Sequence, residues 1–180
     1  LAGVGAGYSL GGAQAVAAMA PVTQTVPAVD KIVGPGNKYV SLAKKRLYGR
    51  CDIDFIAGPS EVLIIADGSA DPALAAADLL AQAEHDPDAV PVLVTPSEKL
   101  ARQVASELEH RLKALATSEV ASLSVSRSAV AVLVSDLEEA VRVANRRAPE
   151  HLELHVREPG RIKEKLRNFG TLFIGPLSVE

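Results

Sequence analysis

The chain has 180 residues, of which 48% are hydrophobic and 23% charged, which is the make-up of an ordinary globular protein. The net charge of −3 and the absence of Trp argue against a nucleic-acid surface, and no apolar run approaches the roughly 18 residues that cross a membrane. A lone cysteine, Cys51, excludes an internal disulfide and a cysteine zinc site, and it favours a cytoplasmic location.

The first 58 residues are rich in Gly, Pro and Ala. The expected elements are a short helix from Gly11 and Gly12, a strand at 31–33, a helix at 38–48 and a strand at 53–56. Residues 34–37 (Gly-Pro-Gly-Asn) form a turn into the second helix, and residues 58–60 (Gly-Pro-Ser) form another, where we place a domain boundary. The glycines match neither a G-x-G-x-x-G motif nor a P-loop, so they indicate turns and close packing. The Gly-rich turns at residues 11–12 and 34–37 nevertheless offer backbone N–H groups at helix starts to a dinucleotide.

Residues 59–180 alternate between short apolar strands and helices. Strands are expected at 62–66, 90–95, 129–134, 152–156 and 171–174. Helices are expected at 71–85, after the Thr-Pro-Ser-Glu of 95–98, after the capping box of 135–138, and near 159–168. This alternation predicts an α/β fold, a mostly parallel sheet with helices on both faces, whose ligands bind beyond the carboxyl ends of the strands.

The helix expected at 71–85 carries a first candidate site. Asp71 suits its N-cap and Pro72 its first position. Gln82 and His85, three residues apart, share one helix face, on which Asp78 also lies. Such a set of nitrogen and oxygen ligands suits a zinc-class ion. The alternative is a polar helix face that ends in a surface histidine.

A second candidate site is the adjacent pair Glu150 and His151. The pair follows Pro149, which stops a helix, and precedes an apolar strand. A carboxylate beside an imidazole can divide the chemistry, because one group activates water while the other moves a substrate proton. The alternative is a solvated polar turn.

Five segments in order resemble the histidinol dehydrogenase family. They are residues 11–15 (GGAQA), 29–37 (VDKIVGPGN), 57–62 (AGPSEV), 77–85 (ADLLAQAEH) and 148–153 (APEHLE). The resemblance covers the whole chain but less than half of the family's enzyme. We therefore expect a central fragment: 1–58 is the C-terminal part of one incomplete Rossmann-like, NAD-contacting domain, and 59–180 is most of a second that carries the zinc and catalytic residues.

The resemblance implies a zinc-dependent homodimer that oxidises L-histidinol to L-histidine through the aldehyde, in two NAD-dependent steps that end histidine biosynthesis. Gln82 and His85 match two of four zinc ligands and also contact substrate. Glu150 matches the group that activates water, and His151 the catalytic base, which contacts substrate too. The remaining matches are a substrate contact and two NAD contacts: Ser60, Gln14 and Asn37. Both pairs should meet at one edge of the sheet.

Several parts of the family pattern are missing. Two zinc ligands, one of them from the partner subunit, and an upstream NAD-contacting Tyr lie outside the chain, so the fragment alone should be inactive. Residues 21–24 (PVTQ) and 169–171 (FGT) also depart from the family's usual residues. Two alternatives remain: a related dehydrogenase for another amino or sulfonated alcohol, and a non-catalytic α/β binding module.

Overall fold

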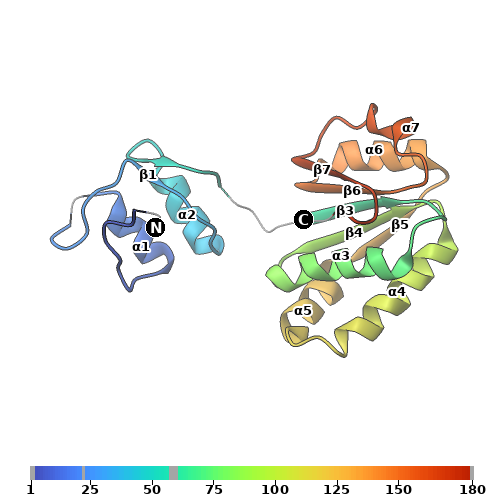
Figure 1. Ribbon diagram of the computed structural model, residues 1–180, viewed down its shortest axis with the longest axis horizontal. Coiled ribbons are helices and arrows are strands. Elements are labelled where there is room, and N and C mark those ends of the chain that lie inside the picture. The colour runs from blue at the N-terminus through green and yellow to red at the C-terminus, as the bar shows by residue number, and fades with distance from the viewer. Residues whose placement is uncertain (1–2, 22, 57–60, 179–180) are drawn as a thin grey trace. The chain divides into compact units, whose positions relative to one another are not determined.

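A computed structural model describes residues 3–21, 23–56 and 61–178. The chain divides into two compact units, Leu1–Gly58 and Pro59–Glu180, and each is considered by itself (Figure 1). The predicted α/β fold with mostly parallel strands is confirmed. Within the described ranges, no helix combines the length and the apolar character that a membrane crossing requires.

In the part of the first unit that the structure describes, there are two helices and a two-stranded parallel sheet. The helices are α1 (Gly12–Met19) and α2 (Lys38–Leu47), and β1 (Lys31–Ile32) pairs with β2 (Asp52–Ile53). A small core of Val16, Ile32 and Cys51 joins these elements. The second strand is shorter than the predicted 53–56: its pairing with β1 covers Asp52–Ile53, and the Asp54 N–H still donates to the Ile32 carbonyl at 3.2 Å.

The second unit is built on five parallel strands in the order β5-β4-β3-β6-β7. Their bounds are β3 Glu61–Ala66, β4 Val90–Thr95, β5 Val130–Leu133, β6 His151–His155 and β7 Thr171–Ile174. The central strand β3 is covered on both faces, which explains its unbroken apolar run.

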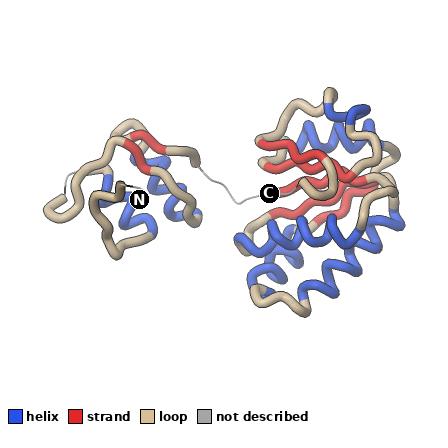
Figure 2. Tube along the Cα trace, viewed as in Figure 1, coloured by secondary structure: helices blue, strands red, loops and turns tan. Residues whose placement is uncertain are grey.

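Helices cover both faces of this sheet (Figures 1 and 2). One face packs against α3 (Pro72–His85) and α4 (Glu98–Leu112), with α5 (Ser118–Ser128) beside α3. The other packs against α6 (Leu137–Arg147) and the single turn α7 (Gly160–Lys163). Alternate residues of β3 divide between these two cores.

Four predictions about the helices of the second unit are refined or corrected. The segment at 95–98 opens α4, with Ser97 as the cap whose hydroxyl accepts the Leu100 N–H. Asp136 caps α6, and Glu139 reaches back to the Ser135 N–H, so the capping box lies one residue later than predicted. The helix predicted near 159–168 is only the turn α7. Helix α5 was not predicted, because its serine-rich sequence shows little helical periodicity.

Candidate functional site

Helix α3 presents Gln82 and His85 together, as their spacing predicts. The Asp71 carboxylate caps the helix by accepting the Ala73 N–H at 2.8 Å, with Pro72 next. Gln82 Nε2 lies 3.4 Å from His85 Nδ1 at the last turn. Gln82 is only 2% exposed, and its Oε1 accepts no hydrogen bond from any described residue. A buried carbonyl oxygen without a partner, beside an imidazole, fits a metal ligand set.

The pair Glu150 and His151 lies where α6 passes into β6. Ala148 ends α6 in the left-handed conformation, with φ of 54°. The Gly170 N–H donates to the Pro149 carbonyl at 3.0 Å, and the Thr171 N–H donates to the Glu150 carbonyl at 2.8 Å. Two backbone hydrogen bonds from the β7 side therefore fix the pair.

The environments of these two side chains differ. Glu150 is exposed, whereas His151 is half-buried as the first residue of β6. The His151 ring meets the edge of Phe173 from β7, with ring centroids 6.0 Å apart. An exposed carboxylate can reach water, while the packed imidazole has a defined orientation, and the two roles expected of the pair require that combination.

Both pairs lie at the same edge of the sheet. His151 is in register with Val62 near the start of β3, and Val62 is in register with Pro91 near the start of β4. Helix α3 runs back along the sheet and ends at His85, five residues before β4 begins at Val90. This is the amino edge of the strands and not the carboxyl edge at which ligands were expected. The rule fails because the residues lie at the end of a crossover helix and at the start of a strand.

His151 belongs to the face of β6 that is turned toward α3. His151, Glu153 and His155 alternate along β6, and Glu153 is in register with Ile64 of β3, which packs with α3 and α4. Asp78 of α3 contacts the same face, because its Oδ2 lies 3.4 Å from His155 Nε2. Since α3 runs opposite to β6, the series Asp78, Gln82 and His85 follows β6 back toward His151.

Asp78, Glu153 and His155 form a buried polar trio between α3 and β6. His155 Nε2 lies 3.3 Å from Glu153 Oε2, and both residues are 2% exposed. Burial and the neighbouring Glu153 charge raise the pKa of Asp78 to about 6, although His155 acts in the opposite direction. Asp78 was expected on the ligand face of its helix, whereas Glu153 and His155 were not predicted as site residues. Polar residues at alternate positions of an otherwise apolar strand were the available signal.

The remaining predicted contacts belong to the first unit or lie outside the described residues. Gln14 is an exposed residue of α1. Asn37 caps α2, because its Oδ1 accepts the N–H groups of Tyr39 and Val40 at 3.1 and 3.2 Å. Ser60 lies outside the described residues. Asn37 thus has a local structural role that its sequence position at a helix start explains.

Comparisons with known proteins agree on one family. The family model for histidinol dehydrogenase matches residues 1–180. The histidinol dehydrogenase of Moorella thermoacetica is 54% identical over 179 residues, 99% of this chain and 42% of that protein. That of Bacillus cereus is 48% identical over 180 residues, all of this chain and 42% of that protein.

A solved structure extends the agreement to three dimensions. The crystal structure of histidinol dehydrogenase from Elizabethkingia anophelis matches with a TM-score of 0.86 and 39% identity, over 94% of this chain and 39% of that one. The chain spans about two fifths of the length of the curated relatives it matches. On this sequence and structural similarity, the chain belongs to the histidinol dehydrogenase family.

Proposed function

We propose that the full-length protein oxidises L-histidinol to L-histidine through the aldehyde, with zinc and two molecules of NAD, as the last steps of histidine biosynthesis. One observation carries this proposal: in a chain of this family, Gln82 and His85 share a sheet edge with Glu150 and His151. The activity is proposed for the full-length protein, because these 180 residues span about two fifths of the relatives.

Gln82 and His85 would hold the zinc ion. The buried Gln82 Oε1, which no described residue satisfies, supports this assignment, and so does the exposed imidazole of His85 one turn later. When bound, zinc acts as a Lewis acid that polarises and orients the amino alcohol. These two residues leave a four-coordinate site incomplete, so residues 1–180 alone are proposed to be inactive.

His151 and Glu150 would move the protons. In the first oxidation the His151 imidazole takes the hydroxyl proton of the alcohol, and its contact with the edge of Phe173 holds the ring for this transfer. In the second oxidation the Glu150 carboxylate takes a proton from the water that attacks the aldehyde. Each oxidation delivers a hydride to the nicotinamide of NAD.

The other assignments follow from the family. Gln14 and Asn37 are proposed to contact NAD, and Ser60 to contact the substrate together with Gln82, His85 and His151. A homodimer is proposed because one further zinc ligand would come from a second subunit. The lone Cys51 and a biosynthetic role favour the cytoplasm.

Zinc content and activity of full-length variants test the proposal. The variant His85→Asn should lose zinc and histidinol oxidation together, because it removes a ligand. A matched control, His110→Asn on the exposed face of α4, should keep both. Full zinc occupancy in the His85 variant, or no NADH formation from histidinol by the wild-type protein, would contradict the proposal.

A further inference from the structure

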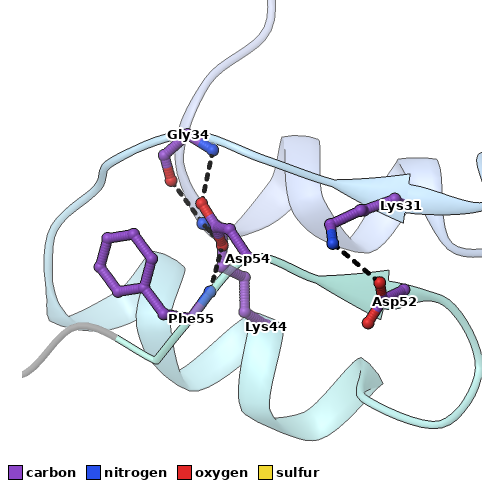
Figure 3. Close-up of polar contacts among 6 residues, drawn as sticks. All are labelled: Lys31, Gly34, Lys44, Asp52, Asp54 and Phe55. Atoms are coloured by element: carbon purple, nitrogen blue, oxygen red, sulfur yellow. Dashed lines mark hydrogen bonds and ion pairs between the residues drawn. The ribbon is translucent and has the colours of Figure 1, made fainter.

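Lys44 carries a charge into the interior of the first unit. The residue lies in the last turn of α2 and is only 4% exposed. A buried ammonium group is costly unless it is paired and hydrogen-bonded. Its Nζ lies 2.7 Å from Asp54 Oδ1 and also donates to the carbonyl of Gly34 (Figure 3).

Asp54 binds the backbone N–H of Gly34, whereas Lys44 binds its carbonyl. Its Oδ2 accepts the Gly34 N–H at 2.8 Å, while its Oδ1 also accepts the Phe55 N–H at 2.8 Å. The Lys44 ammonium and these N–H groups hold the pKa of Asp54 well below its ordinary range. The ion pair therefore satisfies both backbone polar groups of Gly34 (Figure 3).

This arrangement fixes an unusual turn. Gly34 has φ of +135°, a conformation that other residues rarely adopt. At the far end of the turn, Asn37 caps α2, and a Cβ on Gly36 would lie 2.5 Å from the Val40 side chain. The turn of residues 34–37 is thus held by the Lys44–Asp54 pair at one end and by the cap at the other.

We propose that Lys44 and Asp54 are positioning residues for dinucleotide binding, which hold the 34–37 turn in the shape that NAD requires. This inference rests on the proposed function, which places an NAD contact at Asn37. The pair would act through the backbone of Gly34, to which both side chains bond. Holding the turn in its binding conformation in the absence of NAD raises affinity, because less ordering is then required on binding.

A second ion pair in the same unit provides the matched control. Lys31 and Asp52 join β1 to β2 at 2.9 Å, but their side chains are 52% and 56% exposed (Figure 3). No hydrogen bond to the backbone of the turn is found for this pair among the described residues. Replacing Lys31 removes an ion pair from the unit while leaving the turn unchanged.

The test measures NAD binding to full-length variants by calorimetry, together with steady-state kinetics and thermal unfolding. Lys44→Met should raise the Kd and KM for NAD about tenfold, as expected if the turn keeps its binding shape about one tenth of the time. The kcat at saturating NAD and the KM for histidinol should stay within about twofold of wild type, because the reacting groups lie in the other unit. Lys31→Met should leave the Kd for NAD unchanged.

A double variant separates the proposed effect from misfolding. Lys44→Met leaves the Asp54 carboxylate without its cation, whereas Lys44→Met/Asp54→Asn removes both charges and should fold with the same loss of NAD affinity. Wild-type NAD affinity in the folded double variant would overturn this inference alone. Equal losses of NAD and histidinol affinity would also overturn it, since they would indicate general destabilisation. Failure of the wild-type protein to bind NAD would overturn the proposed function as well.

Discussion

The carboxylate of Asp78 faces two buried groups of β6, Glu153 and His155. Because the pKa of Asp78 is raised to about 6 in the folded chain, folding favours its protonated form. The stability that this group contributes is complete below its ordinary pKa of 3.8 and is lost as pH rises through about 6.

Replacing Asp78 by Asn should therefore change how stability depends on pH. The neutral amide cannot ionise. The free energy of unfolding of Asp78→Asn, relative to that of wild type, should therefore increase between about pH 4 and 6 and stay at the higher value above pH 6. Urea unfolding across this pH range measures the effect. The exposed-carboxylate control Glu109→Gln should follow wild type, and parallel curves for Asp78→Asn and wild type would refute the raised pKa.

Glu150 is the residue whose substitution separates zinc binding from water activation. Glu150→Gln should retain zinc, because the carboxylate is assigned to water and not to the metal. The second oxidation should slow by about 10²–10⁴-fold, the usual contribution of one general acid or base. Single-turnover kinetics would resolve the two hydride transfers. Zinc loss, or equal slowing of both transfers, would contradict this role.

At the scale of elements, β7 positions the start of β6. A Cβ on Gly170 would lie 2.6 Å from the Glu150 carbonyl oxygen, and backbone cannot yield as a flexible side chain does. This close approach of Gly170 to the Glu150 carbonyl explains why a glycine comes immediately before β7. It brings the loop before β7 against the loop before β6.

Gly170→Ala should displace the Glu150–His151 segment. We expect a loss of about 1–3 kcal/mol of stability, the typical cost of overpacking, together with reduced turnover. The matched control is Gly160→Ala at the start of α7, where an added Cβ meets no atom within 4 Å, so its stability should change little. Thermal unfolding and histidinol oxidation by the full-length variants check both. Unchanged stability and turnover in Gly170→Ala would show that the loop adapts.

At the scale of the whole molecule, the chain provides two proposed zinc ligands in its second unit and two proposed NAD contacts in its first. Residues 1–180 alone should bind zinc more weakly than the full-length protein by more than about 100-fold, since losing even a group that supports a ligand typically costs about 10–100-fold. Zinc titration of both proteins against a competing chelator measures the ratio. Equal affinities would mean that the assignment of the missing ligands is wrong.

The sequence by itself determined the type and order of most elements. Local signals are sufficient to predict an element where an N-cap residue, a proline or a hydrophobic periodicity determines the backbone within a few residues. Asp71 and Pro72, which begin α3, are an example. They were insufficient for α5, whose burial against α3 depends on contacts distant in the sequence. The proximity of Gln82 and His85 was likewise a local consequence of helical spacing.

Only the tertiary structure decided which distant side chains meet. Strand register, helix direction and loop paths determine three features: the location of the candidate site at the amino edge of the sheet, the contact of Asp78 with Glu153 and His155, and the Lys44–Asp54 pair. No period or spacing encodes the contact of Asp78 with β6 or the Lys44–Asp54 pair, because each joins segments whose separation in space is set by the packing of the whole unit. The alternation of short apolar strands and helices along the sequence therefore indicates an α/β protein, whereas the geometry of its candidate site follows from how β6 and α3 pack.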